Sequence, residues 1–442
     1  MRLNSSYLVI SGWMLLLSIV SPCVMSQTLS ISGGQGKIYP DFEHRIDAMV
    51  MIKDLSAASE LSIDANGLKV EWFEYYNKSY SPQFHTTPLY IGNQPAINPE
   101  DHCGYLVKRS GTVNGVPYSD EISVFVINYT QYVPAEVQVV PLDDAQAASC
   151  TLIELELTGN FPGMSYATPN GLSYPVEREL NLEYETLEWK DQWVSKPVRL
   201  TVVPDNGKIQ VFNPPLKDTY FTLKGDQYAR DLGLDGYSFG SALYAARKVE
   251  CKITTEATVR TEKHEVDRPE QVTAVSGSAP LEILFKSNGN EPVANYYNWT
   301  ITAGDELLLS RTDATHTYTF SKAGTFLVKV RAENAYCSFT DSITVKVAES
   351  AINAPNVFSP NGDGINDEFR VAYKSIIEFH CIIYNRWGSK LYEWTDIQKG
   401  WDGTQNGKPV HEGAYFYVIR ARGSDDIVYN LKGDINLLRG KQ

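Results

Sequence analysis

Residues Leu61-Ser-Ile-Asp-Ala-Asn-Gly-Leu-Lys-Val-Glu-Trp-Phe73 place an Asn66-Gly67 pair between two runs in which apolar and polar side chains alternate. Alternation with a period of two is typical of a β-strand that buries one face. Asn-Gly tolerates the positive φ angles of a two-residue turn, so this stretch predicts a β-hairpin. The pattern recurs where Asp205-Asn-Gly207 separates residues 198–203 from residues 208–212. We therefore expect an all-β protein.

The composition agrees with a chain of β domains. The 442 residues leave room for about three or four domains. The 27 Tyr, 8 Trp and 22 Pro favour strands and turns over helices. A formal charge of -14 suits neither nucleic acid nor an anionic membrane surface, because both attract basic patches. We therefore expect no nucleic-acid partner.

The N-terminus has the pattern of a cleaved signal peptide. Arg2 supplies a positive charge, residues 8–20 are mostly apolar, and small or aliphatic residues precede the bond between Ser26 and Gln27. The pattern predicts cleavage by a signal peptidase at that bond, after entry into the periplasm by the Sec route. Lipid attachment at Cys23 is the alternative, but proline precedes it where a lipobox has a small residue.

Four short motifs follow one another near the C-terminus. They are Asn356-Val-Phe-Ser-Pro-Asn-Gly-Asp-Gly-Ile-Asn-Asp-Glu-Phe369, Tyr384-Asn-Arg-Trp-Gly388, Trp401-Asp-Gly403 and Gly413-Ala-Tyr-Phe-Tyr417. In this order they resemble the gliding-motility-associated C-terminal domain, the type B sorting domain of type IX secretion in Bacteroidetes. The motif positions carried over are Asn361, Gly362, Asp363, Gly364, Asn366, Asp367, Asn385, Arg386, Trp387, Gly388, Trp401, Asp402, Gly403, Gly413 and Tyr415.

This resemblance implies a route out of the cell rather than a chemistry. It predicts that the type IX machinery binds the domain and delivers the protein to the cell surface, associated with the outer membrane, or into the medium. It also implies a small seven-stranded sandwich. We expect four motif aromatics to lie in its core or to pack against its strands, namely Trp387, Trp401, Tyr415 and Tyr417. We expect three motif glycines at turns that need freedom of φ, namely Gly388, Gly403 and Gly413.

Two modules are expected directly after the signal peptide at residues 1–26. Residues 28–132 resemble an immunoglobulin-like sandwich, because Asp101-His-Cys-Gly-Tyr-Leu-Val107 matches the pattern before strand F and Trp72 is a plausible core tryptophan. In that pattern the tyrosine forms a corner hydrogen bond, and Val107 stands where the family usually has cysteine. Residues 134–266 are predicted as a β-rich module of unknown family that contains a short helix.

The next module, residues 269–347, resembles a PKD domain. Tyr297-Asn-Trp-Thr-Ile and His316-Thr-Tyr-Thr-Phe-Ser-Lys-Ala-Gly-Thr-Phe-Leu-Val-Lys-Val330 carry this resemblance. PKD domains have an immunoglobulin-like fold and mostly act as spacers or adhesive modules. With the sorting domain at residues 354–442, the expected architecture is a tandem series of immunoglobulin-like β-sandwich modules.

The cysteines predict at most a few disulfides. Cys150 and Cys251 fall in one predicted module and are the best candidates for a bond, which an oxidising compartment permits. Cys381 lies on an alternating apolar run and is expected to be a small buried hydrophobe. The six cysteines of the precursor are Cys23, Cys103, Cys150, Cys251, Cys337 and Cys381.

The loop at residues 361–367 is a candidate calcium site. Asn361, Asp363 and Asp367 carry side-chain oxygens, which calcium prefers, and the glycines between them let the loop curl. The bidentate glutamate of an EF-hand loop has no clear counterpart. A turn held by Asx hydrogen bonds is therefore the favoured alternative, and no other cofactor is expected.

Three patterns raise the possibility of a catalytic or glycan-binding site. Gly236-Tyr-Ser-Phe-Gly240 fits a nucleophile elbow around Ser238, but the segment before it is polar rather than a buried strand. A carboxylate pair for glycoside hydrolysis could come from Glu183, Glu185 and Glu188. A stacking platform for sugars could come from Tyr75, Tyr76, Trp189 and Trp193, although core packing explains most aromatics.

No complete catalytic set emerges from these patterns. We therefore predict a non-enzymatic secreted or surface protein, exported by a type IX system, with an adhesive or structural role and an unknown protein or glycan ligand. The alternative is a surface-displayed glycan-binding protein or glycan-active hydrolase with its site in residues 28–266.

Overall fold

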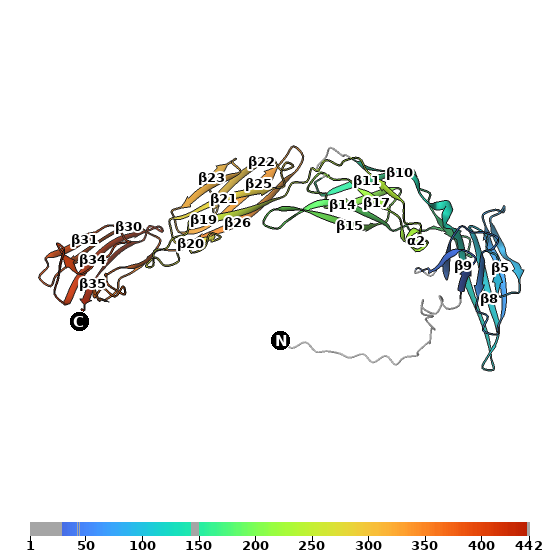
Figure 1. The fold of residues 1–442 in the computed structure, drawn as a ribbon, viewed down its shortest axis with the longest axis horizontal. Helices are drawn as coiled ribbons and strands as arrows, with labels where there is room; N and C mark the ends of the chain where they lie inside the picture. Colours follow the sequence, from blue (N-terminus) through green and yellow to red (C-terminus); the bar gives the residue numbers. More distant parts are fainter. Residues whose placement is uncertain (1–28, 42, 44, 143–149, 440–442) are drawn as a thin grey trace, which may run out of the picture.

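The computed structural model describes residues 29–41, 43, 45–142 and 150–439. The predicted signal peptide, with its cleavage at Ser26 and Gln27, lies outside the described residues. Figure 1 shows units of β-strands arranged in single file, with the N-terminal unit and the C-terminal unit at opposite ends. Almost all regular structure is β, and immunoglobulin-like sandwiches follow one another as predicted.

The N-terminal unit is a sandwich of unequal sheets. A six-stranded sheet in the order β2-β3-β9-β8-β5-β6 faces a three-stranded sheet in the order β1-β4-β7. Its elements are β1 (Leu29–Ser32), β2 (Gln35–Pro40), β3 (Ala48–Lys53), β4 (Glu60–Ile63), β5 (Lys69–Asn77), β6 (Phe84–Gly92), β7 (Ala96–Ile97), β8 (Cys103–Val113), β9 (Val116–Asn128) and the 3-10 helix η1 (Tyr129–Tyr132).

The Asn66-Gly67 turn forms, but the predicted hairpin around it is wrong. Asn66 and Gly67 have φ angles of 46° and 77°, and the Leu68 N–H donates to the Ala65 carbonyl at 2.7 Å. However, β4 pairs with β1 and β7, whereas β5 pairs with β6 and β8. The turn carries the chain from one sheet to the other, so the apolar faces of both strands meet in one core.

The immunoglobulin-like corner is present in the N-terminal unit. The Tyr105 hydroxyl accepts a hydrogen bond from the Glu100 backbone N–H at 2.9 Å. Trp72 is fully buried and packs edge-on against the Tyr105 ring. Val107 is also fully buried and lies opposite Trp72 in the sheet, where the family has its cysteine. An aliphatic side chain therefore fills the place of the missing disulfide.

The second unit has one sheet in the order β10-β11-β16, one in the order β15-β14-β17-β18, and the small hairpin β12-β13. The expected short helix is α2 (Gln227–Asp231), whose N-cap Asp226 accepts from the Ala229 N–H. The second predicted hairpin forms only its turn. Asp205 and Lys208 make one isolated antiparallel bridge, and β15 and β16 on either side of it belong to different sheets. The strands are β10 (Ala135–Leu142), β11 (Leu152–Asn160), β12 (Ser165–Ala167), β13 (Ser173–Pro175), β14 (Leu180–Trp189), β15 (Trp193–Val202), β16 (Lys208–Phe212), β17 (Thr222–Lys224) and β18 (Ser238–Gly240).

The third unit begins earlier than the sequence predicts. Its sheets have the orders β19-β21-β24 and β20-β26-β25-β22-β23. Strand β19 (Cys251–Ala257) was predicted to lie in the second module, yet it pairs with β21 along seven residue pairs. Cys251 is consequently buried in the core of the third unit. The other strands are β20 (Ser276–Gly277), β21 (Leu281–Gly289), β22 (Tyr296–Ala303), β23 (Glu306–Arg311), β24 (Thr315–Phe320), β25 (Gly324–Glu333) and β26 (Ser338–Val347).

The C-terminal unit is built on a five-stranded sheet in the order β28-β35-β34-β30-β31. Two strand pairs, β27-β29 and β32-β33, complete it. Cys381 is fully buried in its core, as expected. The strands are β27 (Ala351–Asn353), β28 (Val357–Phe358), β29 (Ala372–Lys374), β30 (Ile376–Tyr384), β31 (Lys390–Trp394), β32 (Thr404–Gln405), β33 (Lys408–Pro409), β34 (Gly413–Gly423) and β35 (Val428–Leu437).

A shared hydrophobic cluster joins the first and second units. It combines Met51, Tyr75 and Phe125 from the six-stranded sheet with Tyr166 and Tyr228 from the second unit. Both faces of the six-stranded sheet are therefore covered, one by its own small sheet and the other by the neighbouring unit.

A buried ion pair lies beside this cluster. The Arg178 guanidinium pairs with the Asp226 carboxylate, and their side chains are 3% and 0% exposed. The Tyr129 hydroxyl, from the N-terminal unit, donates to Asp226 at 2.9 Å. The Tyr237 hydroxyl accepts from the Asp226 N–H at 2.9 Å. The charge is thus compensated by groups from both units, which a buried carboxylate requires.

A disulfide joins the second and third units. Cys150 bonds to Cys337, 187 residues later in the sequence, so the predicted Cys150–Cys251 bond is wrong. The reason is topological, because Cys251 lies inside the third unit with a free thiol. A second contact comes from the hairpin of β14 and β15, where the Trp193 indole N–H donates to the Asn288 carbonyl at 3.1 Å.

Backbone and side-chain hydrogen bonds join the third and C-terminal units. The Val266 N–H donates to the Tyr373 carbonyl at 2.7 Å. The fully buried Ser375 hydroxyl donates to the Ala348 carbonyl at 2.6 Å and accepts from the Ala279 N–H at 2.9 Å. Each of the three junctions therefore has specific contacts that favour one relative placement of the units.

His316 should make the third unit sensitive to acid. Its ring is 8% exposed between Phe285 and Trp299, and neither ring nitrogen has a hydrogen-bond partner. Burial lowers the pKa of His316 below its ordinary value of 6.5. The unfolded chain therefore takes up a proton that the folded chain resists, so stability should fall as the pH drops below about 6.5.

We expect His316→Leu to raise the free energy of unfolding by about 1–3 kcal/mol and to flatten this pH dependence, because an unpaired buried polar group is removed. Urea unfolding at pH 7.5, 6.5 and 5.5 measures the effect. His380→Leu is the control, since His380 is exposed and paired with Glu393. An unchanged slope between pH 7.5 and 5.5 in His316→Leu would contradict the assignment.

Candidate recognition site on the C-terminal unit

The first sorting motif forms a loop that holds itself in place. The Asp367 carboxylate accepts backbone N–H groups of Asn361, Gly362 and Gly364 at 3.0, 2.7 and 2.7 Å. These hydrogen bonds lower the pKa of Asp367. Asp363 accepts the Ile365 N–H at 2.7 Å and the Asn361 side-chain amide at 2.9 Å.

These contacts match the Asx-turn alternative and explain the loop without a cation. Within the part of the chain that the structure describes, no group of three or more His, Cys, Asp or Glu side chains is arranged to hold a metal ion. Calcium binding by Asn361, Asp363 and Asp367 therefore stays a prediction.

The second motif is a tight turn organised by Asn385. The Asn385 side-chain oxygen accepts the Trp387 and Ser389 N–H groups at 3.0 and 2.9 Å. The Gly388 N–H donates to the Asn385 carbonyl at 3.0 Å, and Gly388 has a φ of 80°. A residue with a side chain is disfavoured at that angle, so the glycine is needed for the turn. The backbone of Trp387 is thus fixed by its immediate neighbours.

Trp387 points into solvent, contrary to the prediction that it packs in the core or against the strands. It is 74% exposed, whereas Trp401 is 0% and Tyr415 is 9% exposed. The physical reason is its place on the turn between β30 and β31, outside the buried cluster of the unit. The sequence contains a signal for this exposure, because the polar residues Asn385 and Arg386 precede Trp387 and a turn glycine follows it.

The third motif is structural. The Trp401 indole N–H donates to the Thr404 carbonyl at 2.8 Å, and Asp402 accepts the Thr404 N–H at 2.9 Å. Gly403 has a φ of 75°, and a Cβ there would lie 2.9 Å from Leu437. Gly413 also has a positive φ, of 141°. Trp401, Asp402 and Gly403 therefore stabilise the fold of the C-terminal unit.

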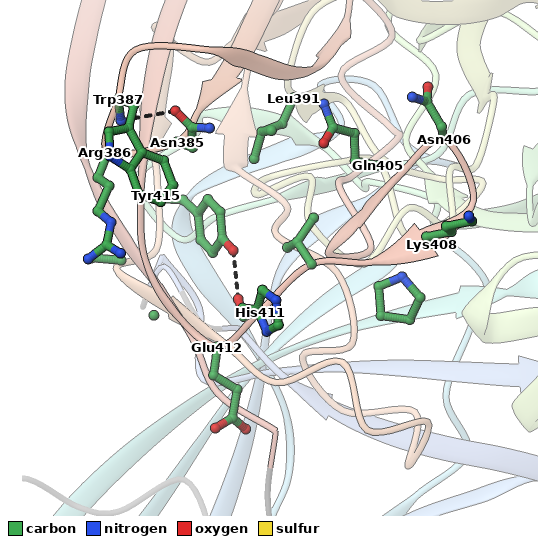
Figure 2. Close-up of a pocket in the computed structure, with 14 residues that line it drawn as sticks. Asn385, Arg386, Trp387, Leu391, Gln405, Asn406, Lys408, His411, Glu412 and Tyr415 are labelled. Atoms are coloured by element: carbon green, nitrogen blue, oxygen red, sulfur yellow. Dashed lines mark hydrogen bonds between the residues drawn. The ribbon is translucent and has the colours of Figure 1, made fainter.

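An open pocket of about 690 Å³ lies between this turn and the segment that leads into β34. Figure 2 shows Trp387 and Arg386 on one side, with His411 and Glu412 below and Lys408 across the pocket. The Tyr415 hydroxyl donates to the His411 carbonyl at 2.6 Å and so holds the segment that leads into β34. Burial raises the pKa of Tyr415, which keeps this hydroxyl a neutral donor.

The charged groups around the pocket are mostly basic. The Arg386 guanidinium lies 4.4 Å from the centre of the Trp387 ring, a cation–π contact. Among the described residues, neither Arg386 nor Lys408 forms an ion pair. The one acidic side chain, Glu412, already accepts the Arg439 backbone N–H.

The catalytic alternatives do not gain support from the geometry. Ser238 lies on β18, a short antiparallel edge strand, rather than at a strand-to-helix turn. Glu183 bonds Lys224 and Arg199, and Glu188 bonds Lys196 and Lys190. The lysine hydrogen bonds lower the pKa of both carboxyl groups, the opposite of what a general acid needs.

The predicted aromatic platform does not form. Tyr75 is fully buried at the first junction, where its hydroxyl donates to the Ala167 carbonyl at 2.8 Å. Trp193 contacts the third unit, and Trp189 packs edge-on against Trp193. These residues therefore hold units together rather than present a flat row of rings.

Comparison with protein families assigns three parts of the chain. A fibronectin type III domain model matches residues 142–241, which the sequence alone left without a family. A PKD domain model matches residues 271–347, and a type IX secretion signal domain model follows at residues 352–434. Fibronectin type III and PKD domains are typically non-catalytic modules, and the third match is an export signal. The type IX secretion signal domain supports export of the chain as a surface or secreted protein.

Comparison with solved structures gives likenesses at low sequence identity. The three N-terminal domains of the bacteriophage RB49 outer capsid protein Hoc are 12% identical, with 69% of this chain and 98% of theirs covered and a TM-score of 0.20. A Ca2+-stabilized adhesin of an Antarctic bacterium is 9% identical, covering 93% and 100%, with a TM-score of 0.20. Immunoglobulin domains 1–5 of Sidekick-1 are 13% identical, covering 84% and 74%, with a TM-score of 0.25. At these scores the likenesses carry no functional argument.

No curated protein matches the chain in sequence. Among the described residues, no helix is both long and apolar enough to span a bilayer.

Proposed function

We propose that this protein is a non-enzymatic, adhesive or structural rod that a type IX system delivers to the cell surface, where it is associated with the outer membrane, or to the medium. We divide it into an immunoglobulin-like module (28–132), a β-rich module (134–266, with its last strand contributed to the next unit), a PKD-like module (269–347) and a sorting domain (354–442). Entry into the periplasm by the Sec route and removal of a signal peptide after Ser26 belong to the same proposal.

The main observation behind this proposal is that the export signal lies at one end of a row of four β units, and that specific contacts join each unit to the next. Contacts at all three junctions hold the row, namely the shared cluster with Arg178–Asp226, the Cys150–Cys337 disulfide and the buried Ser375. A row held in this way sets a defined distance between the sorting domain and the N-terminal unit (Figure 1). A fixed reach suits an adhesive or spacing role better than catalysis.

A projecting arm on the N-terminal unit supports an adhesive contact at the far end. Strands β8 and β9 continue past their neighbours as a two-stranded ribbon, and residues 110–119 carry no charged side chain. Val113, Val116 and Tyr118 on this ribbon are 43%, 64% and 40% exposed. Three apolar side chains at an uncharged tip favour contact with another molecule.

The root of this arm is fixed. The Arg109 side chain pairs with Asp120 and donates to the Asp64 carbonyl at 3.0 Å, while the Tyr118 hydroxyl donates to Asp120 at 3.0 Å. Arg109 is 7% exposed, so its charge is shielded from solvent and compensated by Asp120. The arm can therefore present its tip without first becoming ordered, which lowers the entropic cost of binding.

One experiment tests both halves of the proposal in a host with an active type IX system. Chains lacking residues 354–442 are expected to stay in the periplasm, while the full chain reaches the surface or medium. A full chain with Val113 and Val116 changed to Ser, which leaves Tyr118 on Asp120, is expected to be exported normally and to lose binding. Immunoblots of cell fractions measure export, and arrays of matrix proteins and polysaccharides measure binding.

The deletion needs a folding control, because it removes Ser375 and Tyr373 from the junction with the third unit. An intact Cys150–Cys337 bond in the retained protein, detected by peptide mapping, shows that the upstream units folded. Delivery of the deleted chain to the surface would refute the export role. Unchanged binding by the Ser-substituted arm would refute the assigned contact.

A further inference from the structure

Trp387 is the most exposed aromatic side chain among the described residues of the sorting domain. Its ring is 74% exposed, while its backbone is held by Asn385. A large apolar ring on a rigid turn gains free energy when a partner covers it, because burying apolar surface is worth roughly 25 cal/mol per Å². Its rigidity also means that little conformational entropy is lost on binding. The turn is therefore suited to anchor a binding partner through the Trp387 ring.

The charge around this anchor differs from that of the rest of the chain. Residues 351–442 carry eleven basic and eleven acidic side chains, so the formal charge of -14 belongs to the residues before them. At the pocket, Arg386 and Lys408 are exposed and form no ion pair among the described residues, and Glu412 is the one acidic side chain that lines it. The mouth of the pocket is therefore locally basic and complements carboxylates.

An unpaired strand edge lies beside the same pocket. Strand β31 starts at Lys390, directly after the Asn385 turn, and Leu391 lines the pocket. In the described chain β31 pairs with β30 alone and forms the edge of the five-stranded sheet. Its other side offers backbone groups to an added strand, a common mode of peptide recognition. An extended peptide fits these features, because it can pair with the β31 edge, place acidic side chains near Arg386 and Lys408, and cover the Trp387 ring.

We propose that this pocket docks an extended, acidic peptide segment of the secretion machinery, with Trp387 as the apolar anchor and Arg386 and Lys408 pairing with its carboxylates. This proposal rests on the proposed export of the chain, and it identifies the surface of the sorting domain that the secretion machinery binds. Trp401 has a supporting part, since its buried ring packs against Tyr415, which lines the pocket.

Export of matched full-length variants tests the proposal. Trp387→Ala and the pair Arg386→Glu with Lys408→Glu are each expected to reduce the exported fraction about tenfold or more, with the protein accumulating in the periplasm. A tenfold loss corresponds to about 1.4 kcal/mol of docking free energy. Trp387→Phe keeps an aromatic ring and is expected to be exported to within about threefold of the parent.

Two controls on the same unit separate docking from general surface effects. Phe416→Ala removes an exposed aromatic from β34, and Lys432→Glu reverses an exposed charge on β35. Both are expected to be exported like the parent. A photo-cross-linking residue at position 387 is expected to capture an identified outer-membrane component of the type IX machinery, and the same residue at position 416 is not.

The outcomes distinguish this proposal from the export role itself. If deletion of residues 354–442 blocks export while the pocket variants leave normally, the pocket proposal is wrong and the export role stands. If the deleted chain is exported, both fail. Thermal unfolding and protease resistance show whether Trp387→Ala folds. If it does not fold, export of the Arg386→Glu, Lys408→Glu variant alone tests the pocket proposal. Cross-linking of position 387 to a polysaccharide instead of a protein would also overturn the assignment.

Discussion

Replacing Cys150 and Cys337 together with Ser is expected to lower the free energy of unfolding by about 2–5 kcal/mol. The bond joins residues 187 positions apart, and closing so long a loop removes much entropy from the unfolded chain. Thermal unfolding with and without a reductant measures the effect. The parent should lose stability when reduced, and the double variant should not respond.

Cys251→Ala is the matched control for this prediction. Cys251 is fully buried with a free thiol, and burial raises the pKa of that thiol to about 12. The substitution is expected to cost some packing but to leave the response to reductant intact. Peptide mapping under non-reducing conditions should join the peptides of Cys150 and Cys337. A Cys150–Cys251 linkage in that map would contradict the assignment.

Arg178→Ala is expected to destabilise the junction between the first and second units by about 3–5 kcal/mol, because it leaves the Asp226 carboxylate buried without its partner. Asp226 is 0% exposed and receives hydrogen bonds from Tyr129 and from the Ala229 N–H. Urea unfolding of the full chain measures the loss, and limited proteolysis should show earlier cleavage between the two units.

A double variant separates the ion pair from the packing around it. Arg178→Met with Asp226→Asn removes both charges, so it should recover a large part of the stability lost in Arg178→Ala. Lys196→Ala is the control, since its pair with Glu188 is on the surface and such pairs contribute little. A double variant as unstable as Arg178→Ala would show that hydrogen bonding rather than uncompensated charge dominates.

The sequence predicts well which segments form strands and turns, but it predicts poorly which strands pair with one another. Both Asn-Gly turns form with the positive φ angles that this dipeptide allows, as Asn66 and Asn206 show. Yet neither turn closes a full hairpin, because strands on either side can bury their apolar faces equally well from two opposing sheets. Alternation reports which face is buried, not which neighbour supplies the hydrogen bonds.

The same limit explains the disulfide error. Cys150 and Cys251 are closer in sequence than Cys150 and Cys337, and a boundary near residue 266 places the first two in one module. Strand β19 instead completes the sheet of the third unit and carries Cys251 into its core. A bond between units depends on how the units stack, and local patterns contain no information about stacking.

For the candidate site, the family motifs picked out the residues of the exposed turn but not their environments. Asn385, Arg386, Trp387 and Gly388 were expected as a block, and Trp387 was expected to pack in the core or against the strands, like Trp401. Their environments differ because Trp401 bridges to Phe369 inside the sandwich, while Trp387 lies on a turn between β30 and β31. A tryptophan next to a turn glycine is therefore a better guide to exposure than the motif itself.

The Cys150–Cys337 bond also determines how the protein responds to being pulled. When tension acts between the N-terminal unit and the C-terminal unit, the force crosses this bond and bypasses residues 151–336. Those residues would otherwise contribute on the order of 600 Å of extensible chain, at about 3.3–3.6 Å per residue. A tether that is stretched by flow would therefore keep most of its second and third units folded, and reduction of one bond would convert a short, stiff link into a long, yielding one.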